Sequence, residues 1–226
     1  MFPLSDSFKT GIYPIVTWVI ILINVVVFWM MYMGQNPHPD QYIMEYGLIA
    51  RNLFMPDEVL PLPEKITPVI AHMFMHGGFM HILGNMYFLF IFGDNVEERI
   101  GHVGFAIMYF VFGLCAAAAQ VLSDTGSQMP MVGASGALAG VMGAYMIYFP
   151  QSQVRTLFLL PFFIRIVEIP ALIYMLFWLA MQFMGVLGSG SGVAFLAHIG
   201  GFASGVVFAL IHRGLSGTPH KRYYRI

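Results

Sequence analysis

The sequence predicts an all-α protein that crosses a membrane six times. Of its 226 residues, 58% are hydrophobic and 9% are charged, whereas soluble domains carry about 25% charged residues. The apolar residues gather in long runs, and a backbone inside hydrocarbon must satisfy its own hydrogen bonds, which favours helices. The net charge of -1 gives no sign of nucleic-acid binding, and the single cysteine, Cys115, cannot form a disulfide within the chain.

Six apolar segments account for the six expected helices, in a single domain that covers residues 1–226. The third, fifth and sixth segments approach the ~20 residues that cross a bilayer, and the second and fourth are shorter. The first is long and no small-residue cleavage site follows it, so we interpret it as a membrane span and not as a signal peptide. The six segments are residues 12–33, 79–92, 102–122, 135–149, 168–187 and 192–212.

Lysine and arginine residues predict the orientation of the chain. Eight of the ten lie on the side that holds both termini and the loops after the second and fourth spans, and only Arg51 and Lys65 lie on the other side. The positive-inside rule therefore places the short terminal segments, residues 1–11 and 213–226, in the cytoplasm. The eight are Lys9, Arg99, Arg155, Arg165, Arg213, Lys221, Arg222 and Arg225.

Two connections on the outer side have unusual compositions. Residues 34–78 contain six prolines among many apolar residues, and a connection of this length is usually functional or disordered. It is too apolar for disorder, so we expect an ordered loop that is partly embedded in the membrane. Residues 185–192 end in a run of glycine and serine, which predicts a flexible segment able to move as a lid.

Four polar residues cluster at one level of the predicted bundle. His81 and Asn85 open the second span at i and i+4, and so share one helix face. Ser135 opens the fourth span, and His198 lies about 9 Å along the sixth. All three spans run from the outside inward, so these side chains are expected near the outer ends of three helices.

The length of the fourth segment indicates how deep the serine lies. Residues 135–149 make about 23 Å of helix, against a hydrocarbon core of ~30 Å. Ser135 is therefore expected several ångströms below the outer surface. The irregular stretch before it, residues 123–132, must then enter the protein, which is permitted where it lines a wet cavity. A serine at the floor of such a cavity is typical of a hydrolase.

These residue types fit nucleophilic catalysis. A serine hydroxyl becomes a good nucleophile when a neighbouring base takes its proton, and a partly desolvated His198 is expected to be neutral, as a base must be. No carboxylate lies inside a span near this histidine, which predicts a Ser-His dyad without Asp or Glu. His81, Asn85 and the Ser135 backbone N–H can donate to an oxyanion, and Gly133 leaves room for the backbone of a substrate.

Small residues give the helices a way to approach each other. Gly136 and Gly140 form one G-x-x-x-G pair, and Gly201 and Gly205 form another. Such pairs let the backbones of membrane helices come close. If the two pairs face each other, they bring the serine hydroxyl within hydrogen-bond reach of the histidine.

These residue types also occur in membrane helices without catalysis. A serine beside glycines is often a packing residue, and Ser204 is read in this way. His72 and His76 are spaced i, i+4 with His81 nearby, but Met73 replaces the glutamate of the H-E-x-x-H zinc motif. No metal or other cofactor is therefore expected, and His72 and His76 are expected to hold the long loop by hydrogen bonds.

Four motifs fall in order from about residue 72 onward. They are H-x-x-x-N at 81–85, GDNVEERIG at 93–101, G-x-S-G at 133–136, and Ala-His followed by glycines at 197–205. In these motifs the chain resembles the rhomboid family of intramembrane serine proteases, in its bacterial six-helix form. The resemblance implies a rhomboid-like fold in which the long first outer loop lies sideways in the membrane. It also implies that the last outer loop caps the site and that the fifth helix helps to admit substrate.

The resemblance implies a site and an activity. Ser135 would be the nucleophile and His198 the base, with Asn85 and His81 at the oxyanion. The protein would be an endopeptidase in the plasma (inner) membrane of a bacterium, with its active site open toward the outer face. Its partners would be transmembrane protein substrates and the lipid bilayer, with no nucleic acid.

Two departures and two rival functions accompany this interpretation. Many bacterial members carry Trp-Arg where this chain has Thr67-Pro68, and most carry an aromatic residue that stacks on the histidine where it has Ala139. One rival is a non-catalytic rhomboid-like protein that binds or escorts membrane proteins, which the presence of both Ser135 and His198 argues against. The other is a transporter, but the spans lack the buried charges and paired broken helices typical of one.

Overall fold

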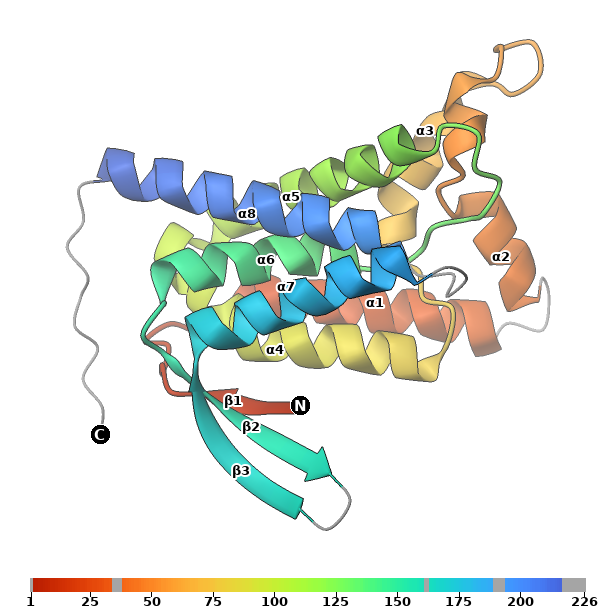
Figure 1. Ribbon diagram of the computed structural model, residues 1–226. Coiled ribbons are helices and arrows are strands. Elements are labelled where there is room, and N and C mark those ends of the chain that lie inside the picture. Colours follow the sequence, from red (N-terminus) through yellow and green to blue (C-terminus); the bar gives the residue numbers. More distant parts are fainter. Residues whose placement is uncertain (1, 34–37, 161–162, 189–193, 217–226) are drawn as a thin grey trace.

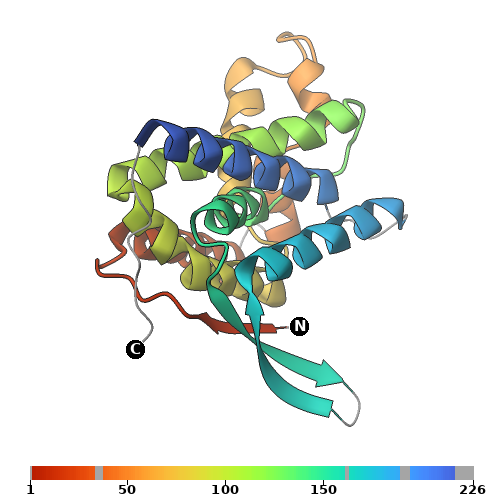
Figure 2. The same cartoon turned by 60° about the vertical axis from the view of Figure 1, so that its left-hand side comes forward.

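The computed structural model describes residues 2–33, 38–160, 163–188 and 194–216. The chain is mostly helical, as predicted, and its helices form a bundle around one central helix (Figures 1 and 2). The bundle helices are α1 (Ile15–Met33), α4 (Phe79–Ile100), α5 (His102–Ser123), α6 (Ser135–Tyr148), α7 (Ala171–Leu187) and α8 (Phe195–Ser216).

Several of these helices have the length and composition of membrane spans. Within the described residues α1, α5 and α8 are long and apolar enough to cross a bilayer. A fourth candidate is a pair of helical segments, Leu62–Phe74 and Phe79–Ile100, which meet at a bend of 72°. The apolar helices α6 and α7 are shorter. The protein is therefore a multi-pass membrane protein, and the count of six spans stays a prediction.

The central helix is α6. Twelve of its fourteen residues are buried, as expected for a helix that is apolar on every side. A Cβ atom added to Gly201 would lie 2.0 Å from the Gly136 carbonyl oxygen, and one added to Gly205 would lie 1.8 Å from the Gly140 oxygen. The two glycine pairs therefore face each other, as predicted, and bring the backbones of α6 and α8 into direct contact.

Helix α4 is longer than predicted. Its sequence turns polar after Phe92, so the second span was expected to end there, but the helix continues to Ile100. Asn95, Val96 and Glu97 are buried, because this part of α4 packs inside the protein and not at its surface.

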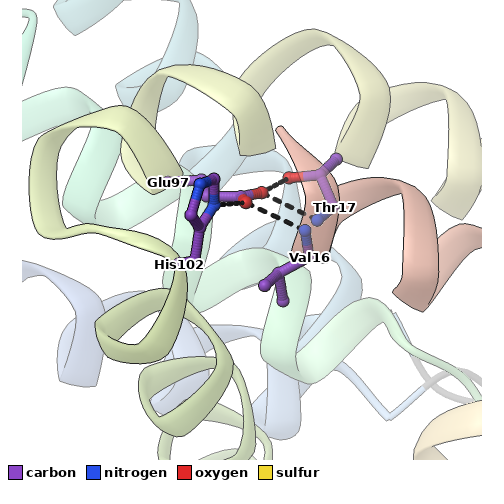
Figure 3. Close-up of polar contacts among 4 residues, drawn as sticks. All are labelled: Val16, Thr17, Glu97 and His102. Carbon is purple, nitrogen blue, oxygen red and sulfur yellow. Dashed lines mark hydrogen bonds and ion pairs between the residues drawn. The ribbon is translucent and has the colours of Figure 1, made fainter. Parts of the chain in front are cut away.

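Glu97 explains why a charged residue is tolerated there. Its Oε1 accepts the Val16 N–H (2.9 Å) and a hydrogen bond from His102 Nδ1 (2.5 Å), and its Oε2 accepts the N–H and hydroxyl of Thr17 (2.7 Å each). Figure 3 shows that these donors surround the carboxylate. Backbone N–H groups at a helix start lack partners within the helix, so Glu97 caps α1 from a neighbouring element.

The fourth connection holds a structure that the sequence analysis did not predict. Strands β2 (Gln153–Leu160) and β3 (Phe163–Pro170) pair antiparallel, and β1 (Phe2–Asp6) pairs antiparallel with β2 to complete a three-stranded sheet. The sheet lies beside the bundle, next to the start of α7 (Figure 1). Glu168 belongs to β3, where it pairs in register with Arg155. Because β3 continues to Pro170, α7 begins at Ala171, three residues later than expected.

The long first connection, predicted to be ordered, is ordered over its described residues 38–78. It contains α2 (Pro39–Tyr46), the 3-10 turns η1 (Ala50–Phe54) and η2 (His72–Phe74), and α3 (Leu62–Ala71). The buried Lys65 joins α3 to the residues before it, because its Nζ donates to the Met55 carbonyl and to Asp57 Oδ1, at 2.5 Å each. Leu48 joins it to the stretch before α6 through paired backbone hydrogen bonds with Met131. These contacts hold the loop in a chain that lacks the Trp-Arg pair.

Candidate active site

A cavity of about 400 Å³ lies between the helices, and all the predicted site residues line it. No Asp, Glu, Lys or Arg is among the described residues of its wall. The lining residues are His72, Met73, Gly77, His81, Asn85, Gly113, Ala116, Pro130, Met131, Val132, Gly133, Ser135, Gly136, Ala137, Ala194, Ala197 and His198.

The serine and the histidine meet in this cavity. Ser135 is the first residue of α6, and His198 lies in the first turn of α8. The Ser135 Oγ and the His198 Nε2 are 2.8 Å apart, within hydrogen-bond distance. The predicted contact is therefore confirmed, and the facing glycines of α6 and α8 explain how two helix starts come this close.

The other ring nitrogen of His198 has a partner that the sequence analysis missed. Its Nδ1 lies 2.8 Å from the Gln182 Oε1 on α7. Gln182 is 9% exposed and lies in an otherwise apolar helix. A single polar residue in an apolar segment indicates a contact inside the protein, since a polar side chain in a membrane helix usually faces protein. This contact places an amide beside the ring, and the dyad without a carboxylate stays a prediction.

Aromatic support for the histidine comes from different helices than in the family pattern. Ala139 is fully buried inside the core and carries no ring. The Trp178 ring of α7 lies 5.9 Å from the His198 ring at 39°, and the Phe195 ring of α8 lies 6.3 Å away, edge-on. Gly185 makes the second contact possible, because a Cβ there would lie 2.4 Å from the Phe195 ring.

The candidate oxyanion donors line the same cavity. The Asn85 Nδ2 lies 2.9 Å from the His76 Nε2, and since an amide nitrogen carries two hydrogens, this contact engages only one of them. The His81 Nε2 would lie 2.8 Å from a Cβ added to Gly133. Gly133 also has φ 131°, a conformation that other residues rarely adopt, so a glycine is required beside His81.

The stretch before α6 lines the cavity, as predicted. Residues 130–133 form part of the wall, and the Gly133 N–H donates to the His72 carbonyl at 2.8 Å. The His72 Nδ1 in turn lies 2.8 Å from the Pro68 carbonyl oxygen. His72 and His76 therefore hold the loop by hydrogen bonds, as expected. In the described part of the chain, no three His, Cys, Asp or Glu side chains are grouped so as to hold a metal ion.

Half of the predicted lid falls outside the described residues. Of the segment 185–192, residues 185–188 complete and follow α7, and residues 189–192 are not described. The movement of this segment therefore stays a prediction.

The fold and this site define a polytopic helical membrane protein with a serine and a histidine hydrogen-bonded in a cavity between its helices. The family model of the Rhomboid domain matches residues 63–214. The chain belongs to the rhomboid family.

Curated relatives are similar over much of the chain. RHOMBOID-like protein 5 of Arabidopsis thaliana is 28% identical over 155 residues, 58% of this chain and 50% of its own length. Rhomboid protein 1 of Saccharomyces cerevisiae mitochondria is 28% identical over 193 residues, 82% of this chain and 50% of its own length. The Rhomboid protease GluP of Bacillus subtilis is 26% identical over 146 residues, 65% of this chain and 26% of its own length. The chain thus spans about half the length, or less, of these relatives.

Proposed function

We propose that this protein is a serine endopeptidase that hydrolyses peptide bonds in or near transmembrane segments of membrane proteins. The observation that carries the proposal is the 2.8 Å separation of the Ser135 Oγ and the His198 Nε2 in the cavity wall. A serine paired with a neutral base is the arrangement that makes a hydroxyl nucleophilic. The relative GluP is a rhomboid protease by name, which supports the same activity.

The proposed reaction has two halves. The Ser135 proton moves to the His198 Nε2 as Oγ bonds to the carbonyl carbon, and the carbonyl electron pair moves to its oxygen. The C–N bond then breaks, and the leaving amine takes the proton from Nε2. Water next attacks the acyl ester with the same base, which releases the acid and restores the serine.

The negative oxygen that forms in each half needs donors. The Ser135 backbone N–H lies at the start of α6, where the helix dipole favours negative charge, and Asn85 and His81 line the same cavity. Donors aimed at a developing charge in a cavity without competing ions are effective because little reorganisation is needed during the reaction.

The apolar setting of the site favours a substrate from within the membrane. We propose that a transmembrane segment enters laterally and unwinds locally, since a helix shields its own peptide bonds. We further propose that the protein lies in a bacterial plasma membrane with both termini in the cytoplasm, so that the site opens toward the outer face.

Cleavage of a transmembrane reporter by purified protein in detergent tests the activity. Wild type should cleave it, and Ser135→Ala and His198→Ala should each lose cleavage by a factor of roughly 10³ or more, with no effect of a chelator. Ser204→Ala is the matched control: its hydroxyl bonds the Gly201 carbonyl of its own helix, away from the histidine ring, and it should cleave like wild type. Equal cleavage by all variants would reveal a contaminating protease. Silence of wild type across several substrates would instead favour a non-catalytic rhomboid-like protein.

A further inference from the structure

The environment of His198 fixes which ring nitrogen carries the proton. The Gln182 Nε2 lies 3.2 Å from the Trp178 carbonyl oxygen, and a carbonyl oxygen can only accept. The NH2 group of the amide must therefore point there, and the Oε1 must point to the His198 Nδ1 at 2.8 Å. The reverse orientation would place two oxygens against each other.

An amide oxygen also only accepts, so Nδ1 must be the protonated nitrogen. In a neutral imidazole the other nitrogen then has a free electron pair. That nitrogen, Nε2, is the one 2.8 Å from the Ser135 Oγ. The hydrogen bonds therefore run in one direction, from Ser135 to His198, from His198 to Gln182, and from Gln182 to the Trp178 carbonyl.

We propose that Gln182 is a positioning residue that holds His198 in the Nδ1–H tautomer, with Nε2 free to take the Ser135 proton. The inference rests on the proposed function of Ser135 and His198. An amide does here what a carboxylate does in a Ser-His-Asp triad, where the third residue sets the tautomer and orientation of the base. No carboxylate, lysine or arginine is among the described residues that line the cavity, and the other titratable groups there are His72 and His81.

The geometry of α7 supports the assignment. Trp178 and Gln182 are spaced i, i+4 and so lie on one face of the helix, and both contact the ring of His198. The Trp178 ring also stacks on Phe202, one turn further along α8, at 6.1 Å and 27°. One face of α7 therefore supplies both the ring beside the base and the acceptor for its Nδ1–H.

The first test reads the tautomer and needs no substrate. Protein labelled with ¹⁵N-histidine is studied in detergent by NMR, with the His198 signals assigned by their loss in His198→Ala. Wild type should show Nδ1 protonated and Nε2 unprotonated. Gln182→Met, similar in shape but with a weakly accepting sulfur in place of the amide oxygen, should show a mixture or the Nε2–H form, and Gln182→Glu should keep Nδ1 protonated. An Nε2–H tautomer in wild type, or no change in Gln182→Met, would overturn the proposal.

The second test uses cleavage of the reporter. Gln182→Met should lower kcat roughly 10- to 100-fold, because a displaced base reacts poorly, and should leave KM unchanged. Gln182→Glu should recover most of the rate. Gln120→Met is the matched control, since the Gln120 Oε1 accepts the Ala197 N–H at 3.2 Å and lies on another helix. It should keep the tautomer and most of kcat.

The two tests separate two failures. If wild type cleaves nothing but its tautomer depends on Gln182, the proposed function fails and the positioning role stands. If wild type cleaves and Gln182→Met has an unchanged kcat, the positioning role is wrong.

Discussion

Gly205 lies where the backbones of α6 and α8 pack against each other. Among the glycines that the structure describes, a Cβ added to Gly205 makes the shortest contact, 1.8 Å to a backbone oxygen. A backbone oxygen moves only with its whole helix. His198 lies two turns away on the same helix, so a change at Gly205 reaches the site through the position of α8.

This closeness gives a prediction. Gly205→Ala should force α8 away from α6 and destabilise the protein by about 1–3 kcal/mol or more, with loss of reporter cleavage. Gly214→Ala is the matched control on the same helix, since a Cβ there meets nothing within 4 Å, and it should be neutral or slightly stabilising. Thermal unfolding in detergent and the cleavage assay measure both effects. Equal behaviour of the two variants would contradict the tight packing.

The site residues differ in how well their sequence positions predict their contacts. Ser135 and His198 are polar residues near the same ends of two apolar helices, and the glycines give those helices a reason to touch. Gln182 lies on a third helix, and its sequence does not say which face of α7 meets α8. The amide could have bonded only to its own helix, as the Asn24 Nδ2 bonds to the Ile20 carbonyl at 2.8 Å. For the same reason, the sequence does not predict that the Trp178 ring lies beside His198.

At the level of elements, the best-predicted helices are those with continuous apolar runs. Helices α1, α5, α6 and α7 begin and end within three residues of the predicted segments. The predicted end of α4 was too early because the sequence does not show that Glu97 is buried. A glutamate is usually a surface residue, and its hydrogen-bond partners here lie on α1 and α5. The pairing of β1 with β2 could not be predicted, because the register that pairs Phe2 with Leu157 joins segments about 150 residues apart.

The capping of α1 by Glu97 leads to a second prediction. Both oxygens accept hydrogen bonds, and an amide could accept with only one. Glu97→Gln should therefore leave buried donors unpaired and destabilise the protein by about 2–3 kcal/mol. Glu98→Gln is the control, because the Glu98 Oε2 accepts one exposed bond, from the Gly11 N–H at 3.2 Å.

Thermal unfolding of the two variants under one detergent condition checks this. The midpoint should fall by several degrees in Glu97→Gln and change little in Glu98→Gln. A Glu97→Gln protein as stable as wild type would show that the cap of α1 contributes no net stability.

The whole molecule has two unlike ends. Figure 1 shows α2 at one end of the bundle and the last turns of α8 at the other. The α2 end belongs to the connection with Arg51 and Lys65, and the far end holds Arg213, which Lys221, Arg222 and Arg225 follow in the sequence. Anionic lipids and the membrane potential favour the basic end on the cytoplasmic side. The site lies at the starts of α6 and α8, and so nearer the α2 end.

This asymmetry yields the last prediction, on orientation. In a Cys115→Ala background, single cysteines are placed at two exposed positions, Thr125→Cys between α5 and α6 and Gln151→Cys between α6 and β2. A membrane-impermeant maleimide should label Thr125→Cys in intact spheroplasts and Gln151→Cys only after lysis, because in the proposed topology the connections at opposite ends of α6 face opposite sides. The background protein should stay unlabelled. Labelling of Gln151→Cys in intact spheroplasts with protection of Thr125→Cys would invert the proposed topology, and would turn the site toward the cytoplasm.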